Sequence, residues 1–392
     1  MKTSRIVIVG SGVGGYSVAQ ALRKRDGAVD LVLVTGEAGA GYSKPLLSNA
    51  IAQKRSAAQW ITSPPEAMAS RLNLTLKSRE PVTAIDVANR CVDTSGGRYG
   101  YDALVLATGA EPARPPIAGD RAREALAVND LDDYARFRAA IEGARRVLVI
   151  GAGLIGCEFA NDLLGANVVP FVVDPGPRPL ASLAPAGTGL ALQRALEAGG
   201  VQWRLGRTVR SIQAAGTGYA ATLDDGEVLR VDAVLCATGL RPRTRLARDA
   251  GLHVNRGIVV DDYGRASRPG ILAVGDCAEY PDGVHPFVRP VLIAAKAMAA
   301  TLLGTPTRIA FPPMPVSVKT PLYPVTVLPP PADTAGDWTP LAEAGSDGFV
   351  FRDSRGAVRG FSLGGASAAS RAQALLGQID TPATTPGPAT AP

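Results

Sequence analysis

Two stretches of the chain, RIVIVGSGVGGYSVA (Arg5 to Ala19) and RVLVIGAGLIGCEFA (Arg146 to Ala160), share one design and decide the fold. Each begins with a short run of β-branched residues, continues with a G-x-G-x-x-G loop, and then reads as the start of a helix. A strand, a glycine-rich loop and a helix in this order are typical of a dinucleotide-binding unit. We therefore predict an α/β fold that contains two Rossmann-like units.

The three glycines of each loop have separate tasks. The first allows a tight turn, the second lets the backbone approach a pyrophosphate, and the third lets the helix pack closely on the strand. These glycines are Gly10, Gly12 and Gly15 in the first loop and Gly151, Gly153 and Gly156 in the second. Each unit also has a later motif, YDALVLATG or VDAVLCATG, so the repeat extends beyond the loop.

A carboxylate after the second strand of such a unit commonly binds the ribose of its nucleotide. In the second unit this residue is Asp174, 18 residues after Gly156, and it favours NADH because it would repel the 2′-phosphate of NADPH. Arg178 is open as a phosphate ligand, although a solvated loop arginine is the simpler interpretation. In the first unit Thr35 occupies the equivalent position, and Glu37 is the candidate for the ribose.

Composition excludes several other classes of protein. The chain has 392 residues, of which 46% are apolar and 19% charged, as in a globular protein with a sizeable core. It has no run of about 18 apolar residues that could span a membrane. The apolar part of the opening MKTSRIVIVGSG is too short for a signal peptide.

The cysteines and the net charge indicate compartment and partner. Cys91, Cys157, Cys236 and Cys277 lie dozens of residues apart, so they form neither a CxxC pair nor a zinc-binding pattern, and we interpret them as buried apolar residues. Reduced thiols favour the cytoplasm. A formal charge of +6 favours an acidic partner, and no basic cluster with interleaved aromatics indicates nucleic acid.

Further motifs add a family resemblance. Together with the two glycine loops, YSKPLLS (Tyr42 to Ser48), ATGLRPRT (Ala237 to Thr244) and ILAVGDCAE (Ile271 to Glu279) look like the FAD-dependent pyridine nucleotide-disulfide oxidoreductase superfamily. The resemblance covers nearly the whole chain. Within the superfamily, NDLDDYARFR, GLIGCEFANDL and PMPVSVKTP resemble the NADH:rubredoxin reductases.

The resemblance implies a glutathione-reductase-like architecture, in which an NAD domain is inserted into an FAD domain. We expect the FAD domain in residues 1–112 and 246–309, the NAD domain in 113–245, a small C-terminal α+β domain in 310–378 and a disordered tail in 379–392. The tail contains mainly threonine, proline, alanine and glycine, which cannot bury a core.

Asn49 raises the question of where electrons leave the flavin. NADH peroxidases, NADH oxidases and coenzyme A-disulfide reductases of similar architecture have a redox-active cysteine after the leucine-serine pair, and ferredoxin reductases usually have lysine there. The CxxxxC motif and the C-terminal histidine base of the disulfide reductases are missing too, since His253 and His285 are the only histidines. Without a thiol relay, we expect reduced flavin to deliver its electrons outward.

The resemblance also gives roles to two lysines. It places Lys44, which precedes Pro45, at the isoalloxazine, where an ammonium would favour the anionic reduced flavin; the alternative is a solvated loop lysine. Lys319 lies in the apolar stretch SVKTP, where an unpaired ammonium would be costly to bury. It must reach solvent or an anion, and the resemblance identifies the anion as the flavin.

Three further positions follow from the same resemblance. Glu158 would reach the nicotinamide and flavin region, with helix-dipole complementarity in the first helical turn as the alternative. Asp276 would bind the ribityl or pyrophosphate region, with a strand-end turn residue as the alternative. Val291 lies at the start of an alanine-rich helix whose N-terminal amides would face the pyrimidine edge of the flavin.

The predicted site has two halves, and we expect its residues to bind and tune the cofactors. The predicted FAD-binding residues are Gly10, Gly12, Gly15, Glu37, Lys44, Pro45, Val82, Thr108, Gly109, Asp276, Val291 and Lys319. The predicted NAD-binding residues are Gly151, Gly153, Ile155, Gly156, Glu158, Asp174 and Gly239. The residues to which we assign catalytic roles are Lys44, Glu158 and Lys319.

The sequence and the resemblance together predict a flavoprotein reductase that takes hydride from NADH onto FAD and passes single electrons to rubredoxin or a similar small acidic carrier. A ferredoxin or flavorubredoxin acceptor is an open alternative, as is a flavoprotein whose NADH-induced state, and not turnover, is the output. The oligomeric state is left open. Arg241, Arg243, Arg352 and Arg355 are either an acceptor-docking patch or solvated side chains.

Overall fold

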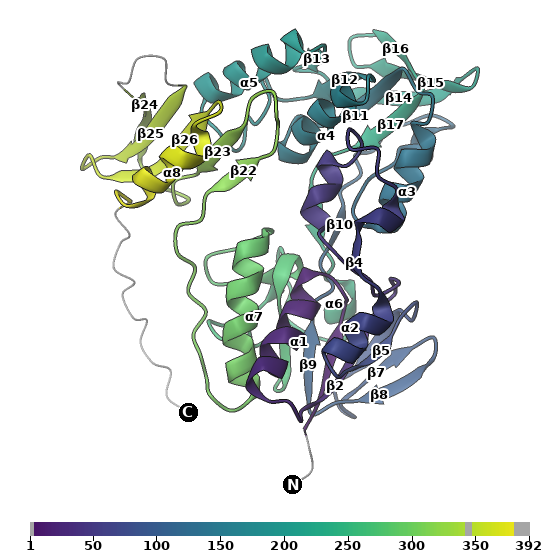
Figure 1. Ribbon diagram of the computed structural model, residues 1–392, viewed down its shortest axis with the longest axis vertical. Coiled ribbons are helices and arrows are strands. Elements are labelled where there is room, and N and C mark those ends of the chain that lie inside the picture. The colour runs from purple at the N-terminus through teal and green to yellow at the C-terminus, as the bar shows by residue number, and fades with distance from the viewer. Residues whose placement is uncertain (1–3, 342–346, 380–392) are drawn as a thin grey trace.

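The computed structural model describes residues 4–341 and 347–379 of the chain. Figure 1 shows three parts: a lower part that contains both early and late segments of the chain, an upper part coloured teal, and a small part coloured yellow at the C-terminal end. The first two parts each contain a parallel sheet and the third an antiparallel one. The predicted α/β fold with two Rossmann-like units and a smaller C-terminal domain is confirmed.

The lower part is built on a five-stranded parallel sheet in which four strands are largely buried hydrophobic runs, as expected of a sheet covered on both faces, while the edge strand β5 is partly exposed. Its strands, in spatial order, are β20 (Ile271–Ala273), β9 (Ala103–Leu106), β1 (Arg5–Val9), β2 (Asp30–Val34) and β5 (Thr75–Lys77). Helices α1 (Val13–Arg25) and α7 (Val288–Leu302) lie side by side in this part (Figure 1). Strand β20 returns to this sheet after the second unit has been completed.

The second unit repeats this arrangement with four parallel strands. They are β13 (Gln202–Leu205), β12 (Val169–Asp174), β11 (Arg146–Ile150) and β17 (Ala233–Cys236). The helices of this unit are α3 (Leu131–Ala140), α4 (Leu154–Gly165) and α5 (Ala186–Ala198). Its entry and exit are paired as an antiparallel ribbon of β10 (Ala110–Pro112) and β18 (Leu240–Pro242). We keep the predicted domain boundaries as a proposal; from residue 380 on, the predicted tail lies outside the described residues.

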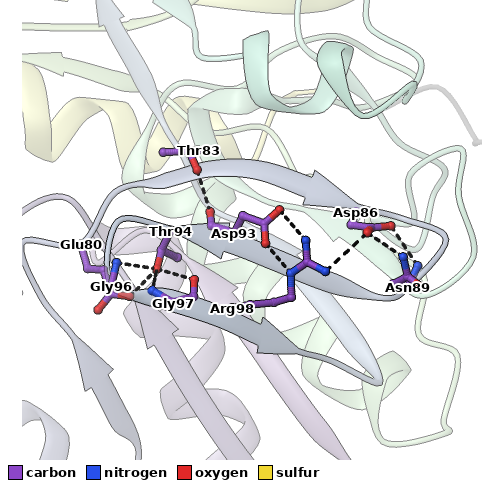
Figure 2. Close-up of polar contacts among 9 residues, drawn as sticks. All are labelled: Glu80, Thr83, Asp86, Asn89, Asp93, Thr94, Gly96, Gly97 and Arg98. Atoms are coloured by element: carbon purple, nitrogen blue, oxygen red, sulfur yellow. Dashed lines mark hydrogen bonds and ion pairs between the residues drawn. The ribbon is translucent and has the colours of Figure 1, made fainter.

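Each unit also has a three-stranded antiparallel meander. The meanders are β6 (Val82–Asp86), β7 (Cys91–Thr94) and β8 (Gly97–Gly100) in the first unit, and β14 (Val209–Ala215), β15 (Gly218–Leu223) and β16 (Val228–Val231) in the second. Figure 2 shows the first meander, where the Arg98 guanidinium donates to the carboxylate of Asp93 at 2.6 Å and lies 4.0 Å from that of Asp86. In the tight turn, the Thr94 hydroxyl oxygen accepts from the amides of Gly96 and Gly97.

The remaining short elements connect these sheets. In the first unit they are β3 (Gly41–Tyr42), η1 (Lys44–Asn49), η2 (Ala57–Trp60), β4 (Ile61–Ser63), α2 (Pro65–Arg71), α6 (Arg245–Asp249), β19 (Ile258–Val259), η4 (Gly275–Cys277) and β21 (Ala278–Glu279), with η3 (Ala122–Glu124) in the second. The 3₁₀ segment η1 starts with Pro45 at its second position, where a proline costs no hydrogen bond.

The C-terminal part is an antiparallel sheet with one helix, α8 (Ala368–Leu376). Its strands, in spatial order, are β22 (Val316–Val318), β23 (Val325–Leu328), β26 (Val358–Gly364), β25 (Gly348–Asp353) and β24 (Gly336–Pro340). Strands β22, β23 and β25 fall in the stretches VSVKT, YPVTVL and GFVFRD, which read as short β-like runs between proline and glycine turns. In β24 and β26, proline or glycine interrupts the apolar pattern.

One hydrophobic core joins all three parts. The buried residues of α4 and β11, such as Phe159 and Val147, belong to the same cluster as Leu47 and Ile51 from the η1 region and Val318 from β22. The η1 segment is therefore packed into the second unit although it belongs to the first in sequence. This shared core fixes the segment after β3 against the inserted unit.

Two further features bear on the sequence interpretation. Cys91, Cys157, Cys236 and Cys277 are all buried and unpaired, as interpreted from their spacing. Among the helices that the structure describes, none has both the length and the apolar character needed to cross a membrane.

Candidate cofactor site

A cavity of about 1060 Å³ opens beside the glycine loop of the first unit. Its volume is at the upper end of what small-molecule and cofactor pockets occupy, roughly 300–1,000 Å³. The predicted FAD-binding residues that line it are Gly10, Gly12, Glu37, Lys44, Val82, Thr108 and Gly109. The structure thus brings together residues from the first loop, the second strand, η1, the meander and the ATG motif.

The geometry of the two glycine loops fits a bound pyrophosphate. Gly10 and Gly151 have φ values of +111° and +110°, and a Cβ at Gly151 would lie 2.5 Å from the carbonyl oxygen of Ala237. A Cβ at Gly10 would collide with the carbonyl oxygen of Ala107 in the same way. These first glycines therefore cannot be replaced without strain.

The second and third glycines differ from each other in the same way in both loops. A Cβ on Gly15 or Gly156 would collide with the carbonyl of the first glycine of its own loop. Around the Cβ position of Gly12 or Gly153 there is open space within 4 Å, beside the helix N-terminus that the glycine caps. Both loops thus leave room for a phosphate group where helix amides can bind an anion.

Lys44 lies in the cavity wall as a half-buried cation. Its Nζ donates to Oδ1 of Asn129 at 2.7 Å, and the Asn129 side-chain amide donates to the carbonyl of Ala110 at 3.0 Å. Burial lowers the pKa of Lys44, while the carboxylates of Asp276 and Glu37 act in the opposite direction. The ammonium is therefore held at the cavity wall by a neutral amide, and no carboxylate of the described residues pairs with it directly.

Acidic groups share the region of this lysine. Glu37 lies in the loop after β2 and lines the cavity. Burial and the neighbouring carboxylate of Asp130 raise its pKa. Burial also raises the pKa of Asp276, and the charge of Lys44 opposes that rise. A carboxylate in the position of Glu37 can accept hydrogen bonds from ribose hydroxyls.

In the second unit, Asp174 is held at the glycine loop. Its carboxylate accepts from the amides of Ala152 at 2.7 Å and Gly176 at 2.6 Å. Arg178 donates through Nη2 to the carbonyl of Ala184 at 3.1 Å. Its guanidinium thus has a partner in its own loop, but its Nε is buried without a hydrogen-bond partner among the described residues. A role of Arg178 as a ligand of the 2′-phosphate stays a prediction.

Glu158, Lys319 and Ser48 form a cluster that the sequence did not predict. Glu158 is fully buried in the second turn of α4, and its Oε2 lies 2.6 Å from the Nζ of Lys319, whose side chain is 34% exposed. Oε1 accepts from the backbone amide of Lys319 at 2.8 Å, and the Ser48 hydroxyl donates to Oε2. Helix-dipole complementarity in the first turn is therefore not the reason for this glutamate.

Residues 4–296 match the family model described as pyridine nucleotide-disulphide oxidoreductase. The chain belongs to this family. Residues 308–379 match a second model, the rubredoxin binding C-terminal domain. Together the two matches extend over nearly all of the residues that the structure describes.

Curated relatives of this oxidoreductase span most of its length. It is 40% identical to the rubredoxin-NAD(+) reductase of Alcanivorax borkumensis over 92% of this chain and 94% of the relative. The rubredoxin-NAD(+) reductase of Acinetobacter baylyi is also 40% identical, over 93% and 94%. The nitric oxide reductase FlRd-NAD(+) reductase of Aeromonas hydrophila is 39% identical over 92% of each chain.

Solved structures of reductases share this fold. The covalent putidaredoxin reductase-putidaredoxin complex aligns with a TM-score of 0.85 and 26% identity, over 96% of this chain and 93% of that one. A ferredoxin reductase from Rhodopseudomonas palustris aligns with a TM-score of 0.87 at 23% identity, over 97% and 96%, which supports the fold alone.

Some predicted residues of this pyridine nucleotide-disulphide oxidoreductase do not line the cavity. They are Gly15, Pro45, Asp276, Val291 and Lys319. Gly15 packs α1 on the loop, and a Cβ on Gly275 would lie 3.6 Å from Val291, so η4 and α7 pack together. Lys319 pairs with Glu158 in the structure, whereas the resemblance implied the flavin as its anion. Their contacts with FAD stay predictions.

Two of the predicted NAD-binding residues lie at an exposed edge of the second unit. Ile155 lies in the first turn of α4 and its side chain is 41% exposed, although it is a large apolar residue. Gly239 follows β17 with a φ of +96° and open space at its Cβ position. Both lie at the carboxyl edge of the second sheet, where α/β units bind their ligands, and their contacts with NADH stay predictions.

Several cavity residues were missed or misread in the sequence. Arg243 was considered for a surface docking patch, but it lines the cavity, and its Nη1 donates to the carbonyl of Thr108 at 3.2 Å. Asn129 and Asp130 line the cavity as well. The NDLDDYARFR motif, quoted only for the resemblance, was the available signal for these two residues.

Proposed function

We propose that this chain is an FAD-dependent reductase that oxidises NADH and passes electrons singly to rubredoxin or a similar small acidic carrier. The observation that carries the proposal is the match of residues 308–379 to a rubredoxin-binding domain, on the same chain as two dinucleotide-binding units. Two curated relatives that share 40% of its residues bear the name rubredoxin-NAD(+) reductase. A net charge of +6 would attract an acidic carrier.

The cavity of the first unit would hold FAD. Its glycine loop offers helix amides to the pyrophosphate, Glu37 offers a carboxylate to the ribose, and Lys44 and Arg243 supply positive charge. When bound, FAD would accept a hydride from NADH and release its electrons one at a time. Lys44 would favour a negatively charged reduced flavin because its own ammonium is partly desolvated.

The loop of the second unit would hold NADH. Asp174 is fixed at this loop by two backbone amides and would accept from the hydroxyls of the ribose. Its negative charge disfavours the additional phosphate of NADPH. The exposed apolar side chain of Ile155 at the same edge would be covered by the bound dinucleotide.

The lining of the cavity supports an outward route for the electrons. Among the described residues that line it, none is a cysteine, and Asn49 occupies the place where related flavoproteins have a thiol. All four cysteines are buried and unpaired. We therefore propose that no thiol of the protein takes up electrons between flavin and carrier.

Two other electron acceptors and a function without turnover are the alternatives to this proposal, which also includes the cellular compartment. The relative from Aeromonas hydrophila that carries the name FlRd-NAD(+) reductase makes a flavorubredoxin the second candidate acceptor. A ferredoxin as the acceptor has less support. The same holds for the alternative that the protein is a flavoprotein that responds to NADH without turnover. We place the protein in the cytoplasm because its four cysteines are unpaired thiols.

The test is steady-state oxidation of NADH by the FAD-loaded protein with purified rubredoxin, flavorubredoxin, a two-iron ferredoxin, a disulfide and oxygen as separate acceptors. Fast turnover with rubredoxin and slow turnover with the disulfide and oxygen is the expected result. Faster turnover with the ferredoxin would reject rubredoxin as the partner. Fast turnover with oxygen or the disulfide would reject the outward route, and slow turnover with every acceptor would favour the non-turnover alternative.

A further inference from the structure

Helix α4 carries three buried polar side chains on one face. Asn161 and Asp162 follow Glu158 by three and four residues, so all three project from the same side of the helix. Their exposed fractions are 0%, 7% and 5%. Because polar groups buried at this depth are costly unless they are hydrogen-bonded, their partners show what this face is built to hold.

Asp162 holds the chain that follows η1. Its carboxylate accepts from the backbone amides of Ile51 at 2.7 Å and Ala52 at 3.1 Å. These amides lie just beyond the end of η1, the segment that begins with Lys44 and includes Ser48. Two hydrogen bonds to one carboxylate fix both the position and the orientation of this segment on α4.

Asn161 and Glu158 hold the C-terminal domain. The side-chain oxygen of Asn161 accepts from the amide of Leu322 at 3.1 Å, and Oε1 of Glu158 accepts from the amide of Lys319 at 2.8 Å. The turn after β22 is therefore bound to the same helix face as η1. The first residue of that turn is Lys319, whose ammonium pairs with Glu158.

We propose that Asp162 and Asn161 are positioning residues, which hold the segments carrying Lys44 and Lys319 on the helix that follows the predicted NADH loop. Neither side chain lines the cavity, so both act through the backbone that they bind. The proposal deepens the proposed function, because the position of these lysines matters only when flavin and nicotinamide are bound between the parts that α4 connects.

The first test is hydrogen exchange of the FAD-loaded protein, read by mass spectrometry on peptides that cover 50–53 and 319–323. Asp162→Ala removes both acceptor oxygens, so two amides in the first peptide should exchange roughly tenfold faster or more. Asp162→Asn keeps one acceptor oxygen and places an NH₂ group against the other amide. Asp162→Asn should therefore accelerate exchange at one of the two amides only. Asn161→Ala should release one amide in the second peptide and leave the first unchanged.

Asp232 provides a matched control. Its carboxylate also accepts from two consecutive backbone amides, those of Arg145 and Arg146, at 2.8 Å each. Asp232 is exposed and lies between β16 and β17, and the two amides lie at the start of β11. Asp232→Ala should accelerate exchange at its own two amides and leave both test peptides at the wild-type rate.

The second readout separates positioning from general stability. In Asp162→Ala we expect a shift of the visible absorption band of the bound flavin and of its reduction potential, and a loss of about fivefold or more in kcat. The KM for NADH should stay within about twofold of the wild-type value, because Asp162 does not touch the glycine loop. Asp162→Asn should lie between Asp162→Ala and wild type in every readout. Asp232→Ala should retain the wild-type spectrum, potential and kcat.

Faster exchange at 50–53 with an unchanged flavin band and potential would overturn the proposal, because Asp162 would then be only structural. Unchanged exchange in both variants of Asp162 would overturn it as well. If exchange, band and potential shift as expected but rubredoxin is not reduced, the proposal stands and the proposed function fails. Should Asp162→Ala not fold, Asp162→Asn and Asn161→Ala provide the same decision at one amide each.

Discussion

The pair of Glu158 and Lys319 allows a prediction with a magnitude. Glu158 is fully buried, and removing the partner of a buried charge typically costs 3–5 kcal/mol. Two features reduce this figure: the Lys319 side chain is 34% exposed, and Glu158 would keep the hydroxyl of Ser48 and one backbone amide as donors. We expect Lys319→Met to lower the free energy of unfolding by about 2–3 kcal/mol at pH 7.

Neutralising Glu158 in place of Lys319 should lower the free energy of unfolding by a smaller amount, because the partly exposed ammonium of Lys319 can turn to water. We expect Glu158→Gln to lower the free energy of unfolding by about 1–2 kcal/mol. In the double variant neither charge is left unpaired, so its loss should be smaller than the sum of the single losses by about 1–2 kcal/mol.

The assay is urea denaturation of the FAD-free protein followed by circular dichroism, so that changes in cofactor affinity do not enter. The m-value must stay constant across the four proteins for the comparison to hold. The control is the same cycle on Arg79 and Asp132, whose side chains are 59% and 53% exposed, where a coupling of at most about 1 kcal/mol is expected. A coupling below about 0.5 kcal/mol for Glu158 and Lys319 would refute the reasoning.

Three other predictions follow from single positions. Asp174→Ala should reduce the ratio of kcat/KM for NADH over NADPH by about tenfold or more, since a charge-assisted contact with the ribose and the repulsion of the 2′-phosphate are both lost; an unchanged ratio would exclude Asp174 as the selector. Gly153→Ala should melt within about 1 °C of wild type but raise the KM for NADH, whereas Gly151→Ala, at φ +110°, should lower the melting temperature by several degrees; equal melting shifts would contradict this assignment. Burial raises the pKa of Asp162 from 3.8 to about 6, and the charge of Glu158 adds to the rise. Tyr134 of α3 is a further titratable neighbour of Asp162. Because the folded state then holds the proton more tightly than the unfolded state, stability should fall by about 3 kcal/mol as the pH rises from about 4 to above 6, and urea midpoints across this range should lose that slope in Asp162→Asn.

The repeated units were predictable because their signals are local. Each strand, loop and helix start lies within about fifteen consecutive residues, and the steric demands at Gly10 and Gly151 come from the same short motif. The sheet order needed one more piece of information, the GDCAE motif, because β20 returns to the first sheet from residue 271.

The polar cluster around α4 could not be predicted in this way. Glu158 meets Ser48 across 110 positions of the chain and Lys319 across 161, and no pattern near any of the three residues indicates the other two. The sequence did show that Lys319 needed solvent or an anion, because an unpaired ammonium in an apolar stretch is costly to bury. Which carboxylate supplies it depends on how the second unit packs against the C-terminal domain, and that is a property of the shared core.

The position of α4 also bears on how the proposed reaction would be organised. The helix begins at the second glycine loop, where NADH would bind, and its buried face holds both η1 beside the FAD cavity and the C-terminal domain that matches a rubredoxin-binding model. The proposed donor site, the segment beside the proposed flavin site and the domain that matches a rubredoxin-binding model thus contact one helix. A reductase without a thiol relay has no covalent intermediate to hold its electrons, so its efficiency depends on the distance and orientation between cofactors and carrier. A helix that continues from the second glycine loop and fixes the other two parts by buried hydrogen bonds is a direct means to keep that geometry constant.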